Sequence, residues 1–211
     1  MPDHAAQDPP VSRQEQRRAH TRGRLLTAAR ELFAEQGVER TRINQITEHA
    51  GVGFGSFYNH FDDKDAIVEA VLRENSDAYG ATVDELTAGV QDPAEVIAIA
   101  HRHLIAAARS DPSFAWLIVR LDVSNRLMLD VFAARALRDL QAGIDSGRFS
   151  VTDPIVTLYA CGGALVGVMQ GVLQGVTPED ADIAHAANML RMLGLTPEDA
   201  AEVAARPLPS V

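Results

Sequence analysis

The sequence predicts an all-α protein made of a small N-terminal part and a larger C-terminal part. Apolar residues recur every three to four positions along most of the chain, which is the period of an α-helix, and alternating β-branched runs typical of strands are few. Glycines and three Asp-Pro pairs punctuate this pattern where helices would end and begin. The expected helices are short up to about residue 75 and longer beyond it.

Length and composition are those of an ordinary globular protein. The chain has 211 residues, 46% hydrophobic and 23% charged, which is enough to bury a core without cross-links. Cys161 is the only cysteine, which excludes a disulfide framework and a metal site built from several cysteines. Residues 1–10 are polar and contain prolines, so we expect no signal peptide and a cytoplasmic protein.

Charge is distributed unevenly, although its formal sum is −10. Residues 11–60 carry eight arginines against five acidic residues, whereas residues 76–211 carry nine basic against seventeen acidic residues. Five of the arginines lie between Arg13 and Arg24, where Glu15 is the only acid. Such a molecule would turn its N-terminal end toward a polyanion, but the same composition is also typical of a solvated, disordered arm.

The N-terminal part is expected to begin with an arm and a helix. Residues 1–20 have the composition of a flexible basic arm. Residues 21–36 form the first expected helix, which Gly37 ends by supplying a left-handed residue.

Two short helices and a longer one are expected next. Thr41 is the expected N-cap of the second helix, which Gly51 ends. The third helix runs from about Gly53 to Phe61, and Asp62 is the expected N-cap of the fourth.

Longer helices are expected in the rest of the chain, and Pro follows Asp at the start of three of them. Their expected ranges are residues 93–109, 112–121, 124–146, 153–175, 178–193 and 197–205. The domain boundary falls near residues 75–90, within or just after the fourth helix. We therefore expect one domain over residues 21–75 and a larger one over residues 76–211.

The segment from Thr41 to Lys64, TRINQITEHAGVGFGSFYNHFDDK, predicts a helix-turn-helix. Gly51 permits positive φ where the chain reverses, and Val52 fills the gap between the two helices. The second of these helices combines Gly, Ser, Tyr, Asn and His and carries no acidic residue. Its small residues allow close approach, and its hydroxyl and imidazole groups can donate to phosphates or base edges. The pattern therefore indicates a helix that enters the major groove of DNA.

This stretch resembles the DNA-binding domain of TetR-family repressors. The similarity covers about Thr21–Leu72 and rests on four motif pieces in register, LLTAARELFAEQG, TRINQITEHAGV, GSFYNHF and DKDAI. It implies an N-terminal three-helix helix-turn-helix DNA-binding domain followed by a larger helical domain for effector binding and dimerisation. The implied function is a ligand-responsive regulator, most often a repressor, that binds a palindromic operator in double-stranded DNA as a homodimer.

The resemblance also implies which residues contact DNA. They are Thr41 and Arg42 at the start of the second helix, Ser56, Tyr58 and His60 in the third, and Lys64 at the start of the fourth. The chain departs from the family pattern at Gly53 and Phe54, where a serine and a basic or polar residue are common. The ring of Phe54 could be exposed and read a thymine methyl group, or it could pack against the first helix or a neighbouring loop.

Residues 155–176 form a long apolar stretch with a four-residue glycine repeat. The repeating residues are Gly163, Gly167, Gly171 and Gly175. Interrupting polar residues, acidic flanks and the lack of a second span argue against a membrane helix, so we expect a buried helix whose glycines allow close packing. In the TetR family the last two long helices form a four-helix dimer interface, and residues 153–175 and 178–193 resemble that pair. Packing within one chain could account for part of the stripe.

The helices between residues 93 and 146 are expected to enclose a pocket for a small, mostly hydrophobic effector. The candidate lining residues are His103, Trp116, Arg120, Asn125, Met128, Phe132 and Tyr159. Aromatic residues at helical spacing are more often part of an apolar core, and the charged ones of surface ion pairs, so both interpretations stay open.

No catalytic constellation is present in the sequence. His101 and His103 are two residues apart, hence on opposite faces of a helix, and Cys161 lies in an apolar helix as an inert thiol would. No G-x-S-x-G, P-loop or dinucleotide fingerprint occurs. We therefore expect neither an enzyme nor a cofactor or metal. The alternative to a regulator is a helical, dimeric small-molecule-binding module whose DNA binding is non-specific or lost.

Overall fold

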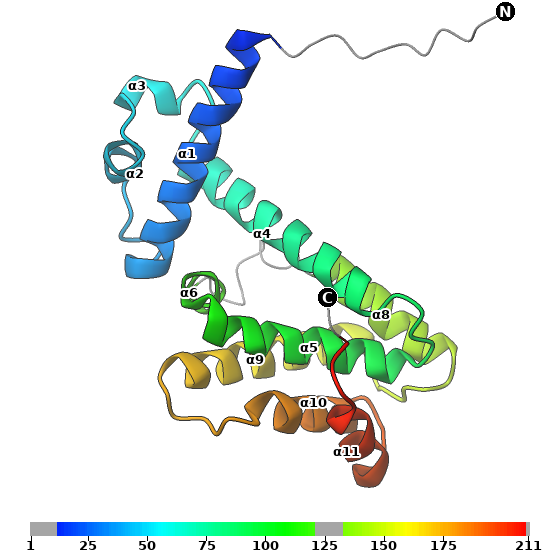
Figure 1. Cartoon of the computed structure of the whole chain (residues 1–211). Helices are drawn as coiled ribbons and strands as arrows, with labels where there is room; N and C mark the ends of the chain where they lie inside the picture. The colour runs from blue at the N-terminus through cyan, green and yellow to red at the C-terminus, as the bar shows by residue number, and fades with distance from the viewer. Residues whose placement is uncertain (1–11, 121–132, 210–211) are drawn as a thin grey trace, which may run out of the picture.

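The computed structural model describes residues 12–120 and 133–209, and every regular element within them is a helix (Figure 1). The all-α prediction is therefore confirmed for the described residues. In Figure 1 a small group of helices at the N-terminal end is joined by one long helix, α4, to a larger helical body.

The small N-terminal domain is built from α1 (Arg13–Gln36), α2 (Ile43–His49), α3 (Phe54–Phe57) and the first half of α4 (Lys64–Leu86). Its core contains apolar side chains from all four helices. The largest are Leu25, Leu32, Phe33, Ile46, Phe57, Phe61, Ile67 and Leu72. This single core fixes the short helices α2 and α3 against α1 and α4, because helices of that length are not stable alone.

Helix α1 begins earlier than the sequence analysis expected. Ser12 is its N-cap, and its hydroxyl accepts a hydrogen bond from the Glu15 amide at 3.2 Å. The Glu15 carboxylate accepts one from the Ser12 amide at 2.8 Å, which completes a capping box. Residues 13–20 are therefore the first turns of α1, and their assignment to a flexible arm was wrong. Residues 1–11 lie outside the described residues.

Two further helix starts differ by one position from expectation. Helix α2 begins after Arg42, whose amide donates to the Gln45 side chain at 2.8 Å. Helix α4 is capped by Asp63, whose carboxylate accepts from the Ala66 amide at 2.8 Å, and not by Asp62. An Asp-Asp pair offers two equivalent caps in sequence, and only the backbone conformation chooses between them.

The body contains α5 (Pro93–Ser110), α6 (Pro112–Arg120), α8 (Ala134–Asp145), α9 (Pro154–Leu173), α10 (Ala181–Met192) and α11 (Pro197–Ala205). Helix α5 packs against α6, α8, α9, α10 and α11, which makes it the central element of the body. The expected helix over residues 124–146 corresponds to α8 in its second half, and its residues up to 132 lie outside the described part. The other expected ranges agree with the observed helices to within a few residues.

Two elements connect the body to the N-terminal domain. Helix α4 is continuous, so Ile67 and Leu72 lie in the N-terminal core while Tyr79 packs in the body. The boundary therefore falls inside a helix rather than in a linker. Helix α6 packs against α1, and Figure 1 shows it beside the C-terminal end of α1.

Candidate DNA-binding face and ligand cavity

The helix-turn-helix presents two aromatic side chains to solvent. Phe57 and Phe61 are buried in the core, whereas Phe54 and Tyr58 are 53% and 50% exposed. The rings of Phe54 and Tyr58 meet edge to face, with 5.7 Å between their centroids. Phe54 is thus half exposed beside Tyr58, which leaves part of its ring accessible to DNA. An exposed aromatic pair of this kind suits contact with a partner.

The other candidate DNA-binding residues surround this aromatic pair in sequence. Arg42 is exposed, and Ser56 and His60 are half-buried. Burial first, and then the positive charges of Arg18 and Arg22, lower the pKa of His60 below its ordinary value. At neutral pH the imidazole is therefore uncharged and can donate or accept a hydrogen bond.

Lys64 and Thr41 make contacts within the chain. The Lys64 ammonium donates to the carbonyl oxygen of Val38 at 3.1 Å, which leaves further N–H groups for a phosphate. Thr41 is only 1% exposed, and its hydroxyl donates to the Gly37 carbonyl oxygen at 2.8 Å. This burial does not fit the expected DNA contact of Thr41, whose side chain instead ties the start of α2 to the end of α1.

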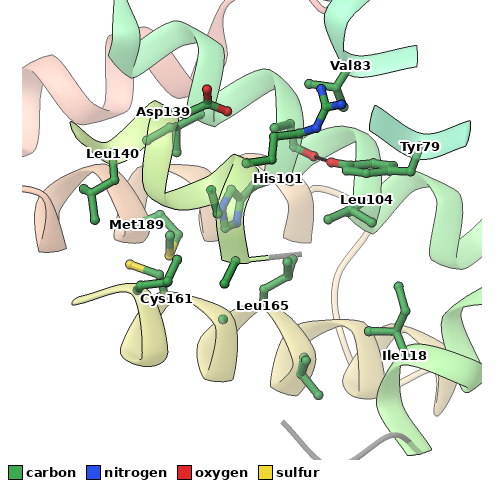
Figure 2. A pocket seen from close by; sticks show the side chains of 18 of the residues that line it. Tyr79, Val83, His101, Leu104, Ile118, Asp139, Leu140, Cys161, Leu165 and Met189 are labelled. Carbon is green, nitrogen blue, oxygen red and sulfur yellow. Dashed lines mark hydrogen bonds between the residues drawn. The ribbon is translucent and has the colours of Figure 1, made fainter. Parts of the chain in front are cut away.

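A cavity of about 200 Å³ lies inside the body, lined from α4, α5, α6, α8, α9 and α10. Most of its wall is apolar. The apolar side chains include Val83, Leu104, Ile118, Leu140, Leu165 and Met189. Figure 2 shows Tyr79, His101 and Asp139 on one side of the cavity, facing Cys161 and Leu165 of α9. An apolar enclosure with a few polar groups on one side is the usual form of a small-molecule site.

Arg135 of α8 links the polar side of this cavity to α4. Its guanidinium donates to the Gly80 carbonyl oxygen at 3.1 Å and to the Asp84 carboxylate at 2.5 Å. A Cβ atom at position 80 would lie 2.5 Å from that guanidinium, so a larger residue there would displace the Arg135 side chain. Arg135 thus lines the cavity and at the same time holds α8 onto α4.

Tyr79 makes a second link between α4 and the cavity wall. Its hydroxyl donates a short hydrogen bond to the carbonyl oxygen of Ala100 in α5, and its ring stacks on His103 at 5.7 Å. Burial raises the pKa of Tyr79 above its ordinary value, so the phenol is uncharged. Asp139, in the same wall, is half-buried and accepts from Arg138 at 2.9 Å. Burial raises the pKa of the Cys161 thiol to about 11, which keeps it protonated.

A buried histidine pair closes the cavity toward α10. His101 Nδ1 and His185 Nε2 are 3.1 Å apart and the two rings stack. Burial lowers the pKa of His101 to about 3 and that of His185 to about 4, so both rings are neutral and share one proton donor. No group of three or more His, Cys, Asp or Glu side chains in the described part of the chain is arranged to hold a metal ion.

The pair predicts a dependence of stability on pH. Between about pH 4 and pH 6.5 the unfolded chain protonates both histidines while the folded chain does not, so the free energy of unfolding should fall as the pH falls. The slope is up to about 1.4 kcal/mol per pH unit for each ring. Denaturant unfolding across this range should give a flatter profile for the double variant His101→Gln, His185→Gln. Equal slopes for parent and variant would contradict the buried neutral pair.

The structure brings together only some of the predicted pocket residues. Tyr159 lines the cavity, whereas His103 and Trp116 do not. The Arg120 side chain and the residues Asn125, Met128 and Phe132 lie outside what the structure describes. The cavity residues that sequence reasoning missed come mainly from α4 and α8. They are Ser76, Tyr79, Arg135 and Asp139, together with His101 of α5.

Helix α9 presents an apolar face to solvent. Val156 is 67% exposed and Tyr159 45%, and Gly163 and Gly167 are exposed with no atom within 4 Å of a Cβ built on them. Helix α9 has a mean hydropathy of 1.7 and is long enough to cross a membrane by length and composition, but only 11% of that stretch is buried. Packing within one chain therefore does not account for the apolar residues on this face of α9.

The glycine repeat divides into two parts. Gly163 and Gly167 lie on the open face of α9, where a second helix could approach closely. A Cβ at Gly171 would lie 2.7 Å from the Thr177 side chain, and Gly175 adopts a φ of +69° just after the helix. Local packing and chain reversal therefore explain the last two glycines without a partner.

Comparison with known proteins gives the same division of the chain. Residues 25–71 match the family model described as bacterial regulatory proteins, tetR family, and residues 92–206 match the tetracyclin repressor-like C-terminal domain. A crystal structure of RolR with its ligand resorcinol has a TM-score of 0.74 and 35% sequence identity, covering 92% of this chain and 98% of RolR. The ligand-free RolR structure has a TM-score of 0.72 and 34% identity, over 89% and 98% of the two chains.

The curated relatives are also transcriptional regulators with a helix-turn-helix. The HTH-type transcriptional repressor KstR2 of Mycolicibacterium smegmatis is 28% identical over 148 residues, which is 62% of this chain and 68% of that protein. YfiR of Bacillus subtilis (strain 168), an HTH-type transcriptional regulator, is 24% identical over 80% of this chain and 87% of its own length. With a helix-turn-helix domain, a helical body and a C-terminal match that spans more than half of the sequence, the chain belongs to the tetR family of transcriptional regulators.

Proposed function

We propose that the protein is a repressor that binds a palindromic operator as a homodimer and releases it when a small phenolic ligand fills the cavity. As a DNA-binding protein it would act in the cytoplasm. The observation that carries this proposal is the position of the cavity. Its wall includes Tyr79 and Val83 of α4 and Ile118 of α6, and these two helices also contact the N-terminal domain.

The size and lining of the cavity support a ligand with one aromatic ring. A cavity of about 150 Å³ is enough to hold benzene, and this one measures about 200 Å³. Its apolar wall suits the faces of a ring, while Asp139 can accept from a hydroxyl group and Arg135 can donate to one. RolR, which is 35% identical, was crystallised with resorcinol, a benzene ring with two hydroxyl groups. We therefore propose dihydroxybenzenes as the effector class.

The contacts of α4 supply a mechanism for release. Arg135 and Tyr79 hold α4 onto α8 and α5, and both side chains line the cavity. A ligand hydroxyl that bonds to Arg135 would compete with its bonds to Gly80 and Asp84 and so change the position of α4. The ligand can shift the DNA-binding equilibrium only by its difference in affinity for the two arrangements.

The proposed homodimer rests on the open face of α9. An apolar face that includes Val156, Tyr159, Gly163 and Gly167 would be costly in water and is suited to helix packing. Two-fold symmetry would then present two copies of α3 to successive major grooves.

The effector proposal is tested by titrating resorcinol into the complex of the protein with operator DNA. Fluorescence anisotropy of labelled DNA measures its release during the titration. The parent protein should release DNA, and calorimetry should detect resorcinol binding to the free protein. The Arg135→Leu variant should bind resorcinol about 10- to 100-fold more weakly, because a hydrogen bond to a charged group contributes about 1.5–3 kcal/mol. Arg109→Leu, an exposed arginine of α5 outside the cavity lining, is the control.

The possible outcomes distinguish a wrong ligand class from a wrong DNA-binding function. Specific DNA binding without any response to dihydroxybenzenes would show that the ligand class is wrong. Ligand binding by a protein that has no sequence preference for DNA would instead favour the small-molecule-binding module.

A further inference from the structure

Helix α1 extends beyond the core that it helps to form. Leu25 is its first core residue, so residues 13–24 form a helical extension about 18 Å long at 1.5 Å per residue. Figure 1 shows this end of α1 projecting past α3. A segment with no core role is free to serve a partner, and its chemistry indicates which one.

The extension is strongly basic in an otherwise acidic protein. It carries five arginines, all of them exposed, within a chain of net charge −10. They are Arg13, Arg17, Arg18, Arg22 and Arg24. Its only acid, Glu15, is bonded to the Ser12 amide in the capping box. The exposed positive charge is therefore not neutralised by acids of the same segment.

Three arginine contacts place the extension beside the helix-turn-helix. Arg24 donates to the Gly51 carbonyl oxygen, in the turn between α2 and α3, at 3.1 Å. Arg18 donates to the carbonyl oxygen of Asn59, next to Tyr58, at 3.2 Å. Arg22 lies over the ring of Phe61 at 5.2 Å. The extension is thus fixed against the segment that presents Phe54 and Tyr58.

Arg13 and Arg17 lie on the same face of α1 as Arg24, closer to the start of the helix. Arg17 precedes Arg24 by seven residues and Arg13 precedes it by eleven, spacings that place all three on one face of the helix. Within residues 12–120 and 133–209, neither Arg13 nor Arg17 has a side-chain hydrogen bond or an ion pair. Their guanidinium groups keep all five N–H donors for an external anion.

We propose that this extension is a second DNA-contacting element, in which Arg13 and Arg17 bind backbone phosphates that flank the half-site read by α3. The assignment rests on the proposed DNA-binding function. A row of guanidinium groups matches the regular phosphates of a duplex in charge and in bidentate geometry. Contacts to phosphates carry no base information, so the element adds affinity and register rather than sequence preference.

The capping box gives the extension a fixed direction. Because Ser12 and Glu15 satisfy the first amides of α1, the helix begins at Arg13 and holds Arg13 and Arg17 in a constant position relative to α3. A flexible arm of the same composition would lose entropy on binding, whereas an ordered helix has largely lost it beforehand.

The test compares the salt dependence of binding to two operator duplexes, one with ten flanking base pairs on each side and one trimmed to its half-sites. The variant is Arg13→Gln, Arg17→Gln, and the control is Arg73→Gln, Arg109→Gln, which removes two exposed arginines elsewhere. On the long duplex the slope of log K against log salt should fall by about 3.6, because the two subunits of the proposed homodimer together lose four phosphate contacts and each contributes about 0.9. The parent should then lose on the order of 100-fold more affinity than the variant between 50 and 200 mM salt. On the trimmed duplex, variant and parent should agree.

A second variant, Ala19→Pro, keeps every arginine but interrupts the helix within the extension. On the long duplex, its slope of log K against log salt should fall as much as that of Arg13→Gln, Arg17→Gln. If Ala19→Pro keeps the parent's slope of log K against log salt, the phosphate contacts do not depend on a fixed helical extension, and that part of the inference is overturned. An unchanged slope for Arg13→Gln, Arg17→Gln on the long duplex, with specific operator binding intact, would overturn this inference alone. A parent protein that binds no DNA would overturn the proposed function as well.

Discussion

Gly167→Glu is expected to dissociate the proposed homodimer and, with it, to reduce operator binding to the weak binding of a single half-site. Gly167 lies on the open face of α9, and no atom lies within 4 Å of a Cβ placed there, so a single chain can accept the glutamate. In a dimer packed through this face, two copies of the carboxylate would enter an apolar interface. Desolvating each charge costs several kcal/mol, which raises the dissociation constant of the dimer by about 100-fold or more.

Sedimentation equilibrium measures the dimer, and circular dichroism measures the helical fold. Ala106→Glu, which adds the same charge to an exposed small residue of α5, should leave the dimer intact. The Gly167→Glu protein should be a folded monomer with weak, single half-site binding. A Gly167→Glu protein that remains dimeric would show that another surface forms the dimer.

Tyr58→Ala is expected to reduce operator affinity by about 30-fold or more while leaving the fold and the proposed dimer unchanged. Tyr58 contacts Phe54 and the buried Phe57 edge to face, but half of its side chain is exposed and can meet DNA. Each base contact contributes about 1–3 kcal/mol, and two-fold symmetry removes it from both half-sites.

Fluorescence anisotropy on operator DNA measures the loss, and thermal unfolding checks the fold. Tyr58→Phe separates the hydroxyl group from the ring, and Lys64→Ala removes the amino group at the start of α4. If both Tyr58→Ala and Lys64→Ala bind DNA as the parent does, the recognition helix has been placed wrongly.

The N-terminal domain was largely predictable because its helices are specified locally. The turn at Gly51, the buried Phe57 and the caps all leave short-range signals in the sequence. The start of α1 was missed although the Ser12-x-x-Glu15 capping box is visible in sequence, because the arginine-rich composition also suits a disordered arm. The burial of Thr41 could not be foreseen, because it depends on how α2 meets the end of α1.

The cavity was less predictable because it depends on contacts between distant helices. Periodicity shows which face of α4 is apolar, but not that Gly80 is covered by Arg135 from 55 residues further along the chain. For helix α9 too, the sequence does not specify which element covers its apolar face. An apolar pattern predicts burial of the helix, but it does not say whether the covering partner belongs to the same chain or to a second copy.

The central claim is that the helix-turn-helix reads specific DNA as a symmetric pair. Selection of bound sequences from a random duplex pool, with purified protein at near-physiological salt, tests it most directly. We expect a palindrome whose half-sites lie about one helical turn, or a multiple of it, apart, bound at least about 10³-fold more tightly than random DNA. Recovery of no motif from protein shown to be folded and dimeric would contradict the account and leave ligand binding in the body as the function.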